Sequence, residues 1–305
     1  MKKSIVILFT LMGVFAIMQG CKTGPKDNPS ALFPFPPDTL NLAEFANFMD
    51  EDTVASIIKE ETKLPNGKTR PKGFVSFPQD GDDFRGLRLD NVYWRGVHVL
   101  HGDFRGSYFR STNCKEGDFS YSDFRVSDMK WAMFDDSRIV DCNFNQAKMF
   151  HVHANGAAMD SSTFRGANMF GMEGHHASLR NCDFSHALMK DTEFLHADFT
   201  GSIAIKVRLV RAVLIGSKVD STDFSYSDFT GGGLEGASFV NSRLLGCNFQ
   251  GAHLQGVDFS GADLKDCYFF GAEFENTVFK DAVNIPKVIQ KMIVDDRVTG
   301  LCDDR

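Results

Sequence analysis

The chain has 305 residues, and its 33 lysines and arginines against 40 aspartates and glutamates give a net charge of −7. A mildly acidic chain of this kind favours solubility and argues against a nucleic-acid partner. The seven cysteines include no Cys-x-x-Cys pair, so the sequence gives no support to a zinc-finger type of site.

Residues 1–20 have the features of a secretory signal, because a basic start precedes an apolar run over residues 4–17. That run is too short for a spanning helix. Residues 18–21 resemble a bacterial lipobox: Gly20 and Cys21 match it, whereas the two residues before them depart from its preferred types. The resemblance implies lipidation of Cys21 and a membrane-anchored lipoprotein of the bacterial cell envelope, on the periplasmic or outer-membrane side. The alternative is cleavage and release.

Two segments follow this signal. Residues 21–38 are polar and proline-rich, which predicts a flexible tether. Residues 39–81 predict a helical N-terminal cap or arm, in which apolar residues such as Leu42 and Phe45 recur at helical spacing and residues 64–67 form a stop. A cap would cover the open end of the repeat that follows, whereas an arm would bind a partner.

A five-residue period then runs without interruption from Asp82 to Phe279. Stepping by five from Phe84 gives 40 positions, of which 32 hold Phe, Leu or Met, and the residue two before is small or Val at 37 of them. Residues two apart in an extended segment point to the same side, so both of these positions face inward. The period fits neither a helix nor a plain strand, and it predicts short extended segments separated by corners.

Four such segments would close one square coil of twenty residues, so that residue k lies over residue k+20. Successive coils would stack about 4.8 Å apart, and ten coils would make a rod on the order of 48 Å long. The stacking predicts interior columns, one of them a ladder of phenylalanines. A second column holds methionines as soft core filler: Met129, Met149, Met169 and Met189.

The runs Gly166-Ala167-Asn168-Met169 and Gly261-Ala262-Asp263-Leu264 resemble the pentapeptide-repeat family, whose pattern is roughly A(D/N)LXX. The resemblance covers residues 82–279, about two thirds of the chain. It implies an all-β fold: a right-handed quadrilateral parallel β-helix of about ten coils over residues 82–281, with short helical caps at the N- and C-terminal ends. Glycine is frequent two residues after the central position, which fits a tight corner.

Residues 282–305 predict the C-terminal helical cap. Asn284 and Pro286 suit the start of a helix. Ile289 and Ile293, with the methionine between them, would then cover the last coil.

Two cysteines of the repeat are predicted to stack. Cys247 and Cys267 are twenty residues apart, and a spacing near 4.8 Å lies within the disulfide range for Cα atoms. Outside the cytoplasm such a bond would persist. The alternative is that cysteine is simply a small residue at a small-residue position.

An outward aromatic patch is predicted between residues 131 and 170. Trp131 stacks under His151, Phe150 stacks under Phe170, and Met133 adjoins them. Exposed aromatic patches on a regular face usually mark a contact surface. Beneath the patch, Ala154 and Gly174 give the interior its weakest filling. We therefore predict a contact face for an envelope protein, a peptide edge or a glycan.

The same coils hold a cluster of histidines. Stacking by twenty predicts that His153, Glu173 and His175 converge, with Glu193 or the stacked pair of His176 and His196 nearby. Imidazole and carboxylate ligands suit zinc or a similar divalent ion. The alternative is a run of surface histidines without the geometry to bind anything.

Three functions remain open on this sequence. The first is a non-enzymatic, lipid-anchored scaffold or binding module that needs no cofactor. The second is a metal-binding or enzymatic protein that uses His153, Glu173 and His175. The third follows from the resemblance, which implies that some cytoplasmic family members mimic DNA and inhibit topoisomerases through an acidic surface. Here a row of aspartates is matched by a row of arginines: Asp83, Asp103, Asp123 and Asp183 beside Arg85, Arg105, Arg125 and Arg165.

Overall fold

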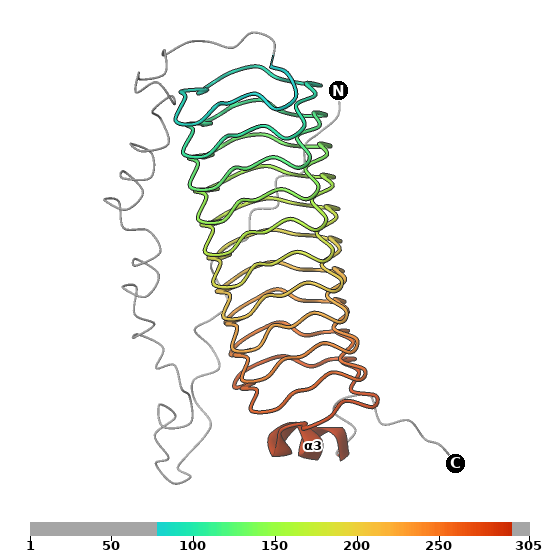
Figure 1. Cartoon of the computed structure of the whole chain (residues 1–305). Helices are drawn as coiled ribbons and strands as arrows, with labels where there is room; N and C mark the ends of the chain where they lie inside the picture. The colour runs from blue at the N-terminus through green and yellow to red at the C-terminus, as the bar shows by residue number, and fades with distance from the viewer. Residues whose placement is uncertain (1–77, 295–305) are drawn as a thin grey trace, which may run out of the picture. The chain divides into compact units, whose positions relative to one another are not determined.

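The computed structural model describes residues 78–294, and most of them wind into coils stacked one on the next (Figure 1). Each extended segment forms a single parallel bridge with the segment 20 residues later, from Asp83 with Asp103 to Asp263 with Val283. The predicted coil of twenty residues is therefore confirmed. Several predicted features lie outside the described residues: the signal at 1–20, lipidation at Cys21, the tether at 21–38 and residues 39–77 of the N-terminal segment.

Every corner has the same backbone geometry. The residue two after each central position has a positive φ, between 49° and 74°, from Gly81 to Asp281. At some corners the N–H one position further on donates to a serine hydroxyl of the next coil, as from Gly102 to Ser122. At most corners it donates to the central carbonyl, as from Leu87 to Phe84 at 3.0 Å. This is the arrangement of a type II turn, whose third residue requires a positive φ. The corner therefore favours glycine, and it tolerates Asn, Asp and His better than most other residues.

Stacked aromatic rings fill much of the interior. The rings of Phe84, Phe104 and Phe124 lie parallel with centroids 4.5 Å apart, and the ladder continues to Phe184. The small side chain of Ala204 ends the ladder. The four predicted core methionines are almost fully buried, with at most 1% of each exposed. The interior columns are thus continuous rows of apolar side chains, stabilised by burial of their area.

The small inward residues make a second kind of contact. Hydroxyl and thiol groups at this position donate to the carbonyl 23 residues earlier, as Ser162 Oγ does to Ile139 O at 2.9 Å. Cys247 Sγ and Cys267 Sγ donate in the same way, at 3.0 and 2.8 Å. Both cysteines are free and buried, so the disulfide considered between them is absent. Each thiol donates to a backbone carbonyl, and the two side chains are close enough to interact as thiols.

The interior beneath the aromatic patch is filled at Gly174. A Cβ on this residue would lie 2.3 Å from Cε1 of Phe194. Met172 is fully buried at the inward position that other units give to a small residue. The small residue predicted at Gly174 is thus compensated by the flanking Phe194 and by Met172, because the large and small residues of this unit have exchanged places.

Replacing Gly174 by alanine should lower the free energy of unfolding by about 1–3 kcal/mol, because the Phe194 ring must move within a packed core. Denaturant unfolding followed by circular dichroism measures the change. Gly233→Ala is the control, since its Cβ would lie 3.3 Å from the flexible Glu235 carboxylate. Equal losses in the two variants would contradict the packing argument.

A short helix, α3 (Lys287–Val294), follows the last coil and lies at its end in Figure 1. It begins directly after Pro286, a residue whose fixed φ suits a helix start. Ile289 and Ile293 are buried in the same apolar cluster as the coil interior. Within residues 78–294, no helix has the length and apolar character needed to cross a bilayer.

Candidate functional site

Four side chains form what we call the aromatic corner: Trp131, Phe150, His151 and Phe170. The rings of Phe150 and Phe170 are stacked, with centroids 5.1 Å apart. Trp131 meets Phe150 edge-on at 6.1 Å, and the His151 ring lies 4.3 Å from Phe150 and 5.9 Å from Phe170. Half of the Trp131 surface is exposed. The structure thus brings together four of the five residues predicted for the contact patch.

The turn geometry positions this cluster. Trp131 and His151 occupy successive corners with φ of 58° and 49°, and their N–H groups donate to Phe150 O and Phe170 O at 3.0 and 2.9 Å. The His151 ring lies over the next corner, where a Cβ on Gly171 would approach it to 2.4 Å. Glycine at position 171 therefore makes room for the imidazole of His151. The stacking of corner residues alone would not have revealed this.

Met133 lies outside the aromatic corner. It sits on the next face, where it bridges to Asn113 and His153. Its predicted place in the contact patch is not supported by any ring contact among the described residues. Three lysines, by contrast, flank the aromatic corner and were missed by sequence reasoning: Lys130, Lys148 and Lys190. The Nζ atom of Lys190 lies 6.0 Å from the Phe170 ring centroid.

The predicted metal cluster does not form. His153 Nδ1 lies 3.0 Å from Glu173 Oε2, whereas His175 Nε2 points to Glu193 Oε2 at 3.9 Å. The rings of His176 and His196 are merely stacked, 5.3 Å apart. Among residues 78–294, no group of three His, Cys, Asp or Glu side chains is arranged to hold a metal ion. Each histidine pairs with the coil that follows rather than with its neighbour on the same coil.

The abundance of histidine has a structural explanation. Five of the nine histidines occupy the corner with positive φ: His101, His151, His176, His186 and His196. Histidine is several-fold enriched in this backbone region. A cluster of histidines in a coil of this kind therefore follows from the turns and needs no ligand.

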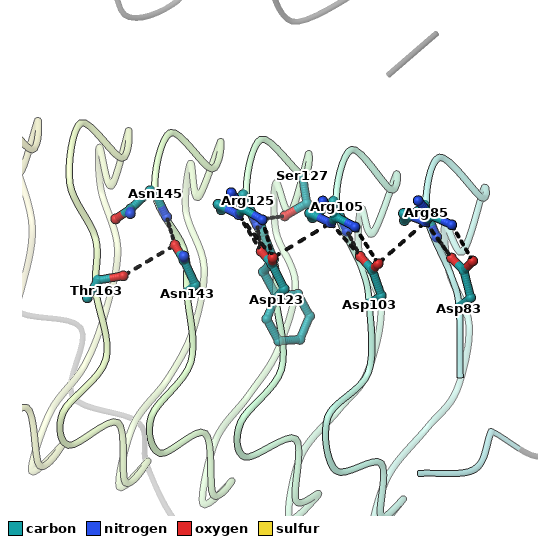
Figure 2. A network of polar contacts seen from close by, with 11 residues as sticks. Asp83, Arg85, Asp103, Arg105, Asp123, Arg125, Ser127, Asn143, Asn145 and Thr163 are labelled. Carbon is teal, nitrogen blue, oxygen red and sulfur yellow. Dashed lines mark hydrogen bonds and ion pairs between the residues drawn. The ribbon is translucent and has the colours of Figure 1, made fainter. Parts of the chain in front are cut away.

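Aspartate and arginine alternate along one face, and Figure 2 shows the row. Arg105 Nη2 lies 2.7 Å from Asp103 Oδ2 on its own coil, and its Nε lies 3.6 Å from Asp123 on the next. Arg85 repeats the pattern with Asp83 and Asp103, at 2.8 and 3.4 Å. The predicted rows of opposite charge thus form an ion-pair ladder from Asp83 to Arg125. Asn143 and Asn145 interrupt it on the next coil (Figure 2), and Arg165 pairs separately with Asp183 at 3.6 Å.

The aspartates of the repeat also serve the turn. An aspartate directly before the central residue accepts a hydrogen bond, through its Oδ1, from the backbone N–H two residues further on. Asp183 accepts in this way from Ser185 at 2.9 Å, and Asp258 accepts from Ser260 at 2.8 Å. This bond satisfies a donor that the turn would otherwise leave unpaired. Much of the acidic character of the surface is therefore fixed by the fold.

Acid should weaken the solenoid through these groups. Burial raises the pKa of the Asp103 carboxyl, but the hydrogen bonds and charge of Arg105, with the charge of Arg85, outweigh it, so the net pKa is lowered. A carboxyl with a lowered folded-state pKa stabilises the fold above its unfolded pKa, about 3.9 for Asp, and this contribution is lost as the pH falls through the folded value.

We therefore expect the free energy of unfolding to fall progressively below about pH 4. Denaturant unfolding at a series of pH values measures this free energy. In an Arg105→Gln variant the free energy of unfolding should fall less steeply with acid, because the pKa of Asp103 moves back toward its ordinary value. An equally steep fall in the variant would contradict this assignment.

Comparisons with known proteins agree with this architecture. The family model for pentapeptide repeats matches eight copies, at residues 175–203 and 247–283. No curated protein sequence matches the chain. The structure resembles the plasmid-mediated fluoroquinolone resistance protein QnrB1 with a TM-score of 0.52 at 16% identity, over 72% of this chain and 96% of that one.

A further similar structure is HetL, a pentapeptide-repeat protein from the cyanobacterium Nostoc sp., with 18% identity, a TM-score of 0.29, and coverage of 69% of this chain and 88% of that one. At these identities the likeness concerns the fold alone. The family match, the likeness to QnrB1 and the uninterrupted five-residue register together identify this chain as a pentapeptide-repeat protein whose solenoid is a right-handed quadrilateral β-helix.

Proposed function

We propose that the protein is a non-enzymatic, lipid-anchored binding module of the bacterial cell envelope, and that the aromatic corner is its contact surface. One observation carries this proposal: the half-exposed Trp131 and the three rings beside it form a cluster of four, whereas other outward rings form pairs, such as His101 with Tyr121 and Tyr268 with Phe270. Exposed aromatic clusters of this kind favour association. The lipobox-like residues before Cys21 support the anchor.

The arrangement of polar groups favours binding over catalysis. A catalytic site needs a nucleophile or base, an orienting group and a reacting atom brought together in a concave site. The two histidines predicted as metal ligands contact different carboxylates, His153 that of Glu173 and His175 that of Glu193, and His176 stacks on His196. The aspartates likewise contact arginines or turn N–H groups, which argues against an open acidic surface that would imitate DNA.

The test uses a matched pair of triple variants. Trp131→Ala, Phe150→Ala and Phe170→Ala together remove the aromatic corner. The control replaces three exposed aromatic residues elsewhere by alanine: Tyr93, Tyr226 and Phe270, which are 68%, 41% and 68% exposed. Each chain is retrieved from detergent-solubilised native membranes, and its bound partners are identified by mass spectrometry.

Loss of a partner from the aromatic-corner variant but not from the control is the expected result. Because the rings of Phe150 and Phe170 are only partly exposed, unfolding curves of both variants must first show that the solenoid is retained. Equal recovery of the partner by wild type and both variants would contradict the assignment of the aromatic corner as the contact surface. A Cys21→Ser chain that still fractionates with membranes would separately contradict the anchor.

A further inference from the structure

The three lysines beside the aromatic corner occupy regular places in the stack. Lys130 precedes Phe150 by one coil, and Lys190 follows Phe170 by one coil, in the same corner row. Lys148 lies two residues before Phe150 and forms parallel backbone bridges with Asp128 on one neighbouring coil and with Asn168 on the other. From Trp131 to Lys190 the row spans three coil spacings, about 14 Å. The row of aromatic residues thus has a lysine at each end and one beside it, and the Lys190 ammonium lies 6.0 Å from the Phe170 ring centroid.

The charges of these lysines are not compensated locally. None of the three makes an ion pair within the part of the chain that the structure describes, whereas the neighbouring carboxylates already have partners. Asp128 pairs with Arg110, Asp191 pairs with Arg211 at 2.7 Å, and Glu173 contacts His153 at 3.0 Å. An overall acidic protein therefore presents a locally positive and aromatic edge.

The backbone of this edge is closed to a peptide partner that would bind as an added strand. Such a partner needs unpaired N–H and C=O groups. The N–H groups of Trp131, Met133, His151 and His153 all donate to neighbouring coils, at 2.9 to 3.0 Å. A partner here must instead meet side chains on a convex edge, which a flat surface does readily.

We propose that the aromatic corner and its three lysines rest on an anionic phospholipid surface, and so hold the anchored solenoid along the membrane. This inference rests on the proposed function and names what its contact surface meets. Tryptophan and other amphipathic rings are favoured at the headgroup level of a bilayer. Lysine stems follow the apolar surface while their ammonium groups reach the phosphates. The arginines of the ladder attract no lipid phosphate, since their charges are already matched by aspartates.

The two tryptophans of the chain provide the measurement. The full chain is incorporated into vesicles of brominated phosphatidylcholine, with and without phosphatidylglycerol, and the quenching of tryptophan emission is recorded. Trp94 is 2% exposed and Trp131 is 50% exposed, so a Trp131→Phe chain supplies the baseline. We expect quenching of Trp131 that requires phosphatidylglycerol and disappears at high salt.

Replacing Lys130, Lys148 and Lys190 by glutamine should lower the ratio of docked to undocked solenoid roughly 100-fold, since a lysine near an anionic surface contributes about a factor of five to membrane binding once its free energy is converted. The control replaces Lys206, Lys218 and Lys280 by glutamine, which changes the net charge equally at sites remote from the aromatic corner. It should leave quenching unchanged.

Trp131 quenching that is absent, independent of phosphatidylglycerol, or equal in the two lysine variants would overturn the inference. The proposed function would survive that result if the aromatic-corner variant still lost a protein partner in the retrieval experiment, which would identify the occupant as a protein. Failure of both experiments would remove the aromatic corner as a contact surface.

Discussion

Replacing Phe124 by alanine should lower the free energy of unfolding by about 3–5 kcal/mol, because it empties a space that the surrounding coils fill only partly. The Phe124 ring is fully buried. It is stacked between Phe104 and Phe144, with centroids 4.5 and 4.9 Å away. The loss therefore includes the transfer of the ring and its contacts on both faces, and denaturant unfolding measures it.

Phe270→Ala is the matched control for this change. Its ring is 68% exposed, so the same substitution should alter the free energy of unfolding by less than about 0.5 kcal/mol. Comparable losses at the two positions would show that the ladder does not stabilise the solenoid.

Deleting one residue should do far more damage than deleting twenty. Removal of Gly251 alone shifts every later residue by one place, which moves Leu254, Phe259 and the following inward residues out of the core. Each expelled side chain costs roughly 1.5–3 kcal/mol, and a few of them exceed the total stability of a typical domain, about 5–15 kcal/mol. Removal of residues 232–251 joins two corners in register and leaves a solenoid shorter by one coil, as repeat proteins allow.

Limited proteolysis with mass spectrometry separates the two outcomes. The chain that lacks Gly251 should be digested beyond residue 251, and the chain that lacks residues 232–251 should resist. Equal resistance of the two chains would contradict the rule that residue k lies over residue k+20.

The sequence could predict the coil because the inward positions differ from the outward ones in the size and apolar character of their side chains, at a fixed spacing of five residues. The same stacking rule placed Phe150 beside Phe170, and the structure has these two rings in contact. Trp131, which the rule placed beside His151, meets the Phe150 ring edge-on. Stacking by twenty depends only on the count of residues, and no insertion disturbs that count between residues 82 and 279.

The rule could not predict where a side chain points once it leaves the backbone. His175 was expected to turn toward Glu173, yet it lies on a turn, where its Nδ1 accepts the N–H of Leu195 at 3.3 Å. Cys247 does lie next to Cys267, as the stacking rule predicted, but the two are free thiols and Cys247 donates to a backbone carbonyl. The count of residues thus gives the neighbour but not the hydrogen bonds or the covalent bond that a side chain makes.

The lysines beside the aromatic corner were missed for a different reason. A surface lysine is unremarkable in a sequence, and the significance of Lys130, Lys148 and Lys190 arises from the carboxylates around them. Only the geometry shows that Asp128 and Asp191 already pair with arginines. The same geometry explains five of the histidines as corner residues, whereas His153 and His175 contact separate carboxylates, those of Glu173 and Glu193.

Footprinting with hydroxyl radicals on native membranes compares the chain in place with the chain purified in detergent, and so reports directly whether the aromatic corner is covered. Trp131, Phe150 and Phe170 should be protected in the membrane and become reactive after purification. Tyr93 and Phe270, both 68% exposed, should react equally in the two states. Equal reactivity of the aromatic corner in both states would contradict the claim that this surface is the contact site of the protein.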